Sequence, residues 1–412
     1  SQIVLDLFGD CKNYDLEKTL QRLCSKAKLD NDCYLDPETQ VLAYDTRTFK
    51  ADRNGTVTEL YRYNTPLPEI DESLLNERIS LAEEWFLQNT NPQTGLLEYM
   101  YYPSSDSYSS DNNHVRQLAT LWSMVELRKF LKSDRLDFVI NNTFEEYFIN
   151  SICADDSCYI DIDDSAKIAY NAFMILGLLG RSEDSETMLS KLGQALLNQQ
   201  QDDGSYYTYF NSDSTSGADY YPGESMLALM RLYEHTGDKR YLDSVYRAFS
   251  YYRSYWRNKK NTAFVPWHTQ AYLLLYEETK ESEVAEFVFE MTDWLIDTYQ
   301  INESPYHDII GAFNRGNPRN ATFVYLEGIN DAYELALIVG DTYRAAKYKE
   351  SIQAGTRFTL LSQYTAENSF YIENPARAIG GFRESLTSNP QRIDYVQHAV
   401  SALMKVVSND IF

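Results

Sequence analysis

The feature of this sequence that most constrains its fold is the alternation of two kinds of helical segment after about residue 71. One kind is apolar on nearly all sides, and a helix of that kind has to be buried. The other kind is amphipathic and charged, as expected of a half-solvated outer layer. The apolar segments are 114–131, 166–180, 223–237, 267–279, 325–340 and 394–407. The amphipathic segments are 73–89, 133–150, 182–200, 238–256, 281–299 and 341–361.

This alternation predicts an all-α fold, an (α/α)6 toroid of six helical hairpins with the apolar helices in an inner ring. Short turns with Gly and Asp, such as those at 237–238 and 340–341, link each inner helix to the next outer one. The opposite links are long. Because long loops gathered at one end of a scaffold often carry binding groups, we expect the site at that end.

The chain is predicted to divide into a small N-terminal extension, residues 1–70, and a catalytic barrel, residues 71–412. Within the extension we expect a short helix in 15–27 and strands in 39–51 and 55–63. The extension is expected to pack on the barrel. A chain of 412 residues that is 43% hydrophobic has ample material for a large core, which excludes a disordered protein.

The charge balance limits the partners that the protein can have. A formal net charge of -24 repels nucleic acid and anionic membranes, so no nucleic-acid partner is expected. No run of about 18 apolar residues occurs, which predicts a soluble chain. Because the sequence begins at Ser1 rather than Met, a preceding signal or anchor stays open, and so do the cellular location and the oligomeric state.

Five cysteines leave the redox state open. Cys153 and Cys158, in CADDSC, are spaced to close a small disulfide loop, but reduced or buried thiols are the alternative. No histidine lies close to these cysteines in the sequence, and tandem CxxC pairs are absent, so no metal is expected there. No cofactor is expected either. The one place where a metal ion would find carboxylates is the group Asp161, Asp163 and Asp164.

Tyrosine is the outlier in composition, with 34 residues against 19 Phe and 5 Trp. Its ring stacks on apolar faces and its hydroxyl forms hydrogen bonds, and a sugar needs both contacts. A carbohydrate is therefore the expected partner. The alternative is that many of these tyrosines line seams between helices.

The first turns of the predicted inner helices carry polar residues at the long-loop end. Such residues are costly in a buried helix unless they are used, although a helix cap is the alternative role for the aspartates. We expect catalytic roles for Glu224, Glu327, His268, His398 and Asp164. We expect substrate binding by His114, Arg116, Gln117, Lys167, Tyr220, Tyr221, Trp267, Gln270, Tyr325, Arg383, Arg392 and Asp394.

Histidine gives the sharpest signal, because three of the five in the chain, His114, His268 and His398, fall in these first turns. Histidine exchanges protons near neutral pH, and burial raises the pKa of a glutamate on an apolar helix. Glu224 and Glu327 lie on such helices, so acid–base chemistry is feasible.

Arginines in the last two long loops form a second cluster. In a protein this acidic they point to a carboxylate or phosphate on the ligand, and an anionic sugar is one option. Surface ion pairs with the abundant Asp and Glu are the equally weighted alternative. The cluster consists of Arg315, Arg319, Arg377, Arg383 and Arg392.

At the level of the fold, residues 71–412 resemble the (α/α)6 carbohydrate enzymes: the N-acylglucosamine 2-epimerase group, the glucuronyl C5-epimerase catalytic region and the six-hairpin glycosidases. The segment YYPGESMLALMRLYEHTGDKRYLDSVYRAF carries this resemblance. PWHTQ, around His268, is similar to the Pro-Gly-His segment of the 2-epimerase group, and His398 falls where that group has its second histidine. HVRQLATLWSM is similar to its first inner helix, which matches Arg116 to a substrate-positioning arginine.

Three departures from the 2-epimerase pattern are visible. Trp267 replaces the glycine, the acidic residue that follows the family histidine is absent, and the last helix has no His-Val-Pro segment.

Three functions follow from these residues. The first is a glycoside hydrolase in which Glu224 and Glu327, or Asp164, share the acid and base roles. The second is a sugar epimerase or isomerase in which His268 and His398 are the acid–base pair. The third is a toroid without catalysis that binds a glycan or a protein.

Overall fold

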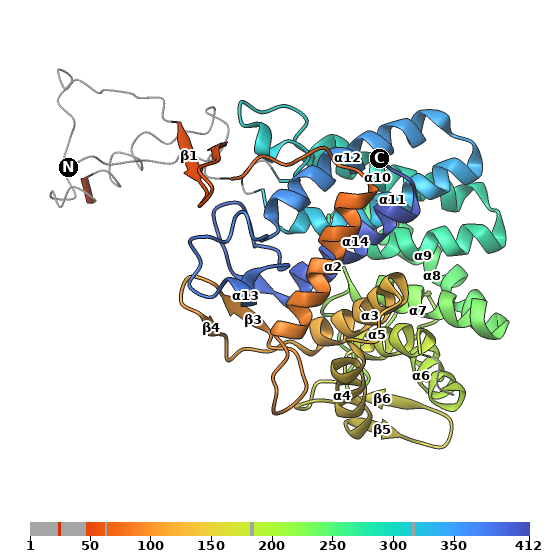
Figure 1. Ribbon diagram of the computed structural model, residues 1–412. Helices are drawn as coiled ribbons and strands as arrows, with labels where there is room; N and C mark the ends of the chain where they lie inside the picture. The colour runs from red at the N-terminus through yellow and green to blue at the C-terminus, as the bar shows by residue number, and fades with distance from the viewer. Residues whose placement is uncertain (1–23, 26–46, 62–63, 182–184, 315, 317) are drawn as a thin grey trace.

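The computed structural model describes residues 24–25, 47–61, 64–181, 185–314, 316 and 318–412. Over this part of the chain it confirms the predicted toroid, an inner ring of helices surrounded by an outer layer (Figure 1). The helix expected at 15–27 lies outside the described residues except for Cys24 and Ser25, which are helical.

The inner ring is closed. Each of its helices packs on the next one along the chain, and the last packs back on the first. At this seam the hydroxyls of Ser123 and Ser401 lie 3.2 Å apart. The ring consists of α3 (His114–Leu131), α5 (Ile168–Leu179), α7 (Tyr221–Thr236), α9 (Phe264–Thr279), α11 (Ala321–Val339) and α14 (Ile393–Ser408).

The outer helices bury one face each against the ring. Among them, α2 packs on both α14 and α3 and so covers the seam where the ring closes. There, Trp85 Nε1 donates to Gln391 Oε1 over 2.9 Å. The outer layer consists of α2 (Glu72–Gln88), α4 (Asp137–Ile149), α6 (Glu186–Asn198), α8 (Lys239–Asn258), α10 (Ser282–Tyr299) and α12 (Thr342–Ser362).

The turns from inner to outer helices are short, as predicted. Gly237 and Gly340 end α7 and α11 with φ of 72° and 76°, a left-handed conformation that glycine adopts at little cost. After Gly237, Asp238 is the N-cap residue of the outer helix α8, and its side chain accepts a hydrogen bond from the Arg240 amide.

The opposite end of the ring, where the inner helices begin, is called the mouth below. Small sheets lie in its long links: β4 (Ser107–Tyr108), β3 (Met100–Tyr102) and β7 (Gln391–Arg392) pair in that order, all antiparallel. Because β7 runs directly into α14, this pairing fixes where the last inner helix starts.

Further short elements complete the description. A second hairpin, β5 (Ser151–Cys153) and β6 (Cys158–Ile160), is closed by a disulfide between Cys153 and Cys158. In the N-terminal region, β1 (Thr48–Ala51) pairs with β2 (Val57–Leu60), inside the two segments predicted as strands. The remaining elements are η2 (His307–Ile309) and α13 (Pro375–Ala378). No helix of the described chain is both long and apolar enough to cross a membrane.

Candidate active site

A layer of rings spans the interior of the toroid. Phe173 on α5 packs edge-on against Trp267 on α9, with ring centroids 5.4 Å apart, and Trp267 lies 5.9 Å from the ring of His398 on α14. These helices are not neighbours, since α7 stands between α5 and α9 and α11 stands between α9 and α14. The contacts therefore cross the inside of the ring, and Trp267 and His398 both face it.

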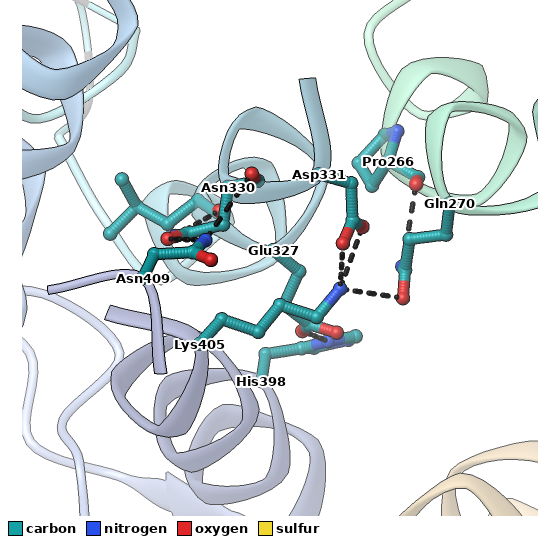
Figure 2. Close-up of polar contacts among 9 residues, drawn as sticks. Pro266, Gln270, Glu327, Asn330, Asp331, His398, Lys405 and Asn409 are labelled. Carbon is teal, nitrogen blue, oxygen red and sulfur yellow. Dashed lines mark hydrogen bonds and ion pairs between the residues drawn. The ribbon is translucent and has the colours of Figure 1, made fainter. Parts of the chain in front are cut away.

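His398 forms a tight pair with Glu327 from α11 (Figure 2). The distance from His398 Nδ1 to Glu327 Oε1 is 2.6 Å, the Glu327 side chain is fully buried and the His398 side chain is 17% exposed. A carboxylate accepts a hydrogen bond, which assigns the proton to Nδ1. The other nitrogen, Nε2, then has a free lone pair, and the ring has the form of a base oriented by a buried acid.

One turn further from the mouth, a second polar network also crosses the interior (Figure 2). Lys405 Nζ donates to both carboxylate oxygens of Asp331, at 2.7 and 2.6 Å, and to Gln270 Oε1 at 3.1 Å. Burial raises the pKa of Asp331, and Lys405 opposes that rise. The predicted residue Gln270 thus belongs to a polar network that lies below the His398–Glu327 pair. The other two members, Asp331 and Lys405, were not predicted from the sequence. Asp331 lies one turn after Glu327 and Lys405 lies two turns after His398, and this helical spacing is the signal that would have found them.

His268 is buried away from this layer. Its Nδ1 lies 2.8 Å from the carbonyl oxygen of Phe264, and its ring stacks on the Phe264 ring. The rings of Tyr252 on α8 and Tyr272 lie 5.6 and 5.7 Å away. Burial lowers the pKa of His268 to about 3, so the ring is neutral. No contact among the described residues joins it to His398.

Glu224, on α7, is a buried carboxyl group. Its Oε2 has no hydrogen-bond partner within the described chain, and burial raises the pKa of Glu224 to about 8. At neutral pH the group is therefore mostly a neutral acid that can donate a proton. Tyr221, one turn nearer the mouth, has its pKa raised by burial first and then by Glu224.

An aspartate and two arginines meet at the mouth between α14 and α3. Arg392 binds both oxygens of Asp394, with Nε to Oδ1 at 2.5 Å and Nη2 to Oδ2 at 2.9 Å. Arg116 Nε lies 3.1 Å from Asp394 Oδ2, and its Nη1 donates to the Tyr99 hydroxyl at 2.6 Å. The sequence-predicted residues Arg116, Arg392 and Asp394 are thus brought together.

Lys167 stands at the start of α5, the other neighbour of α3. Its Nζ lies 5.6 Å from the centre of the Tyr170 ring. Burial first, and Arg116 second, lower the pKa of Lys167, which puts the two cations within electrostatic reach of each other.

His114 and Gln117 line a polar cavity of about 340 Å³ on the other side of α3. His114 Nδ1 lies 3.1 Å from the Tyr147 hydroxyl, and burial lowers the pKa of His114. Gln117 Nε2 donates to the carbonyl oxygen of Leu97 at 3.1 Å and to Asn112 Oδ1 at 3.0 Å.

Several predicted site residues have other surroundings. Asp163 and Asp164 occupy an exposed turn with φ of 55° and 59°. Arg383 is buried and donates to Asn64 Oδ1 at 3.1 Å, which ties the segment before the barrel to the last long link. Tyr325 donates to Thr262 Oγ1 at 2.8 Å, and Tyr220 is exposed.

The remaining arginines of the loop cluster have acidic partners where they are described. Arg319 lies 3.8 Å from Glu384, and Arg377 lies 3.2 Å from Asp106. Arg315 lies outside the described residues. Within the described ranges, no group of three or more His, Cys, Asp or Glu side chains is arranged to hold a metal ion.

Comparison with known proteins supports the fold. No family model and no curated protein matches the sequence. Among solved structures, D-mannose isomerase superposes with a TM-score of 0.61 at 12% identity, covering 83% of this chain and 100% of that one.

Two hydrolases superpose over a similar length. An α-1,6-mannanase of glycoside hydrolase family 76 from Salegentibacter sp. HEL1_6 has a TM-score of 0.60 at 9% identity, covering 82% of this chain and 100% of that one. An unsaturated glucuronyl hydrolase specific for heparin has a TM-score of 0.56 at 11% identity, covering 83% and 99%. The chain therefore has the fold of the six-hairpin toroid carbohydrate enzymes.

Proposed function

We propose that this chain is a carbohydrate-active enzyme that interconverts an aldose and a ketose, with His398 as the group that moves the proton. The observation that carries the proposal is the 2.6 Å hydrogen bond between His398 and the buried Glu327 inside the ring. Such a carboxylate fixes the orientation and tautomer of the imidazole and leaves Nε2 as a base. The likeness in fold to a D-mannose isomerase supports the choice of reaction.

Isomerisation moves one proton between adjacent carbons, and a single base suffices. In the proposed step, His398 Nε2 removes the proton from C2 of the open-chain aldose. The electrons of that C–H bond form a C1–C2 double bond, and the C1 carbonyl oxygen takes the negative charge. The same nitrogen then returns the proton to C1, the proton of the C2 hydroxyl passes to the C1 oxygen, and C2 becomes the carbonyl.

Arg116 is the group that we assign to binding and positioning the substrate at the mouth end of the ring. Its partner Asp394 lies four residues before His398 on α14, so the arginine is held roughly 6 Å, or one helical turn, nearer the mouth than the base. The Arg116 side chain is 36% exposed, which leaves donors for a substrate oxygen.

A two-base epimerisation through His268 and His398 has less support. Inversion at one carbon needs a second group on the opposite face of the planar intermediate. His268 is fully buried, and its Nδ1 is engaged by the carbonyl of Phe264. We therefore favour the one-base reaction.

The proposal is tested by incubating the protein with a panel of aldoses in D₂O and analysing the products by NMR. We expect a ketose to form, with no more than one solvent deuterium at the exchanging carbon. Recovery of the C2 epimer instead would support the two-base reaction. A panel left entirely unchanged would contradict the enzyme and favour a binding toroid.

A glycoside hydrolase is the second candidate, because Glu224 is a buried carboxyl group whose pKa is raised to about 8, as a general acid requires. The inactive variant of the Salegentibacter mannanase has two consecutive aspartates replaced, and Asp163 and Asp164 are consecutive here. Hydrolysis predicts new reducing ends from an oligosaccharide such as α-1,6-mannotetraose, and their loss in Glu224→Gln.

A further inference from the structure

Three cations stand at the beginnings of three consecutive inner helices. Arg392 is the N-cap residue of α14, Arg116 lies in the first turn of α3 and Lys167 is the N-cap residue of α5. The N-terminus of a helix is its positive end, so a cation there is unfavourable, and capping residues are usually Ser, Thr, Asp or Asn. Neither Arg392 nor Lys167 caps its helix by a side-chain hydrogen bond. A cation at each of these positions destabilises its helix, so we expect the three cations to have a role other than stabilising the fold.

The negative charge among these groups is smaller than the positive charge. Asp394 is buried between the two arginines, accepts hydrogen bonds from Arg392 and forms an ion pair with Arg116. Asp163, in the exposed turn before α5, is close enough to raise the pKa values of His114 and Tyr170, and Asp161 also acts on Tyr170, but neither aspartate forms an ion pair with Lys167. Three cations around one buried carboxylate leave an excess of positive charge, and the helix N-termini add to it.

Lys167 is the cation of this group that lacks a carboxylate partner among the described residues. No carboxylate forms an ion pair with its amine among the described residues, although the side chain is partly removed from water. Arg116 repels it as well, and the two effects together lower its pKa. A partly buried ammonium group without a counterion is stabilised when an anion binds beside it.

We propose that the substrate is an anionic sugar whose carboxylate or phosphate binds between Arg116 and Lys167 at the mouth. This rests on the proposed function in taking the ring interior as the active site, and it adds the class of sugar. Because Asp394 and His398 are one turn apart on one face of α14, an anion held beside Arg116 leaves the reacting carbons one turn deeper, at the base. That separation suits a sugar that carries its charge at the end remote from C1 and C2.

The charge of the whole chain makes this local excess selective. A net charge of -24 disfavours anions over most of the surface, whereas the clustered cations at the mouth raise their concentration locally. Attraction of this kind weakens as salt is added, and binding of a neutral sugar does not.

The test measures binding separately from turnover, in the otherwise full chain carrying His398→Asn so that no probe is converted. Calorimetric titrations use D-glucuronate, D-glucose 6-phosphate and D-glucose. We expect at least one of the two anions to bind at least about tenfold more tightly than glucose, and the better of the two identifies the anionic group. Adding Lys167→Met should abolish most of that preference and leave glucose unaffected.

Two further variants make the result specific. Lys167→Arg keeps the charge and should keep the preference. Lys239→Met removes an exposed lysine at the start of α8, at the other end of the ring, and should change nothing. Equal binding of all three probes, no binding of any, or an equal loss for all in Lys167→Met would overturn the inference. Anion preference in a protein whose unsubstituted form converts no sugar would instead contradict the proposed function and still support an anion-binding site between Arg116 and Lys167.

Discussion

Two histidine–glutamate pairs of the same length, 2.6 Å, lie in different parts of this molecule. His398 and Glu327 meet inside the ring, where the side chains are 17% and 0% exposed. His235 and Glu186 meet on the outside, where they are 42% and 62% exposed. Water competes for the outer pair and screens its charges, whereas the inner carboxylate has no such alternative. The comparison teaches that bond length alone does not identify a catalytic pair.

The largest expected effect separates the two histidines. His398→Asn should lower kcat for aldose–ketose conversion by about 10³-fold, because it removes the base, whereas His235→Asn should leave kcat unchanged. Steady-state kinetics on the converted aldose measure both. If His398→Asn retained more than about a tenth of the activity, His398 would not be the base, and the inner pair would differ from the outer pair only in its burial.

A smaller effect is expected at the two glutamates. Glu327→Gln keeps the shape but not the charge, so it should lower kcat about 10²-fold with little change in KM, because Glu327 orients His398 rather than touching the substrate. Glu186→Gln should change neither constant. A rise in KM with kcat preserved would show that Glu327 binds substrate instead, and thermal unfolding of both variants controls for misfolding.

The smallest effect is expected at His268, which is not exposed to solvent and has no carboxylate partner in the described chain. Its folded-state pKa of about 3 lies below its unfolded value, so between these values the unfolded chain binds a proton that the folded chain does not. Stability should fall as pH falls through this window, by at most about 1.4 kcal/mol per pH unit.

The measurement is the free energy of unfolding in urea at about pH 6 and about pH 5. His268→Gln should flatten the dependence relative to the unsubstituted protein, whereas His235→Asn, at an exposed site, should leave it nearly unchanged. Identical slopes in His268→Gln and the parent would mean that the buried ring takes up a proton in the folded state.

The ring of inner and outer helices could be predicted from the sequence. A helix buried on all sides is apolar all round, whereas a helix buried on one side is amphipathic, so the two kinds differ in their patterns of apolar residues. Which side of an inner helix faces the interior could not be predicted, since an apolar helix has no polar face to mark it. Adjacent residues differ by about 100° around a helix, and that step turns Trp267 inward and His268 outward. The His398–Glu327 pair spans 71 positions, so it emerges only when α11 and α14 are packed together.

The seam between Ser123 and Ser401 has a consequence for when the protein becomes competent. These hydroxyls are 278 positions apart in the chain, so the contact closes a long loop and is made only when α14 packs back on α3. The helix that closes the seam, α14, also carries His398 and Asp394. Under the proposed function, a chain whose final hairpin has not docked lacks both the base and the anchor for Arg116, and we expect it to be inactive.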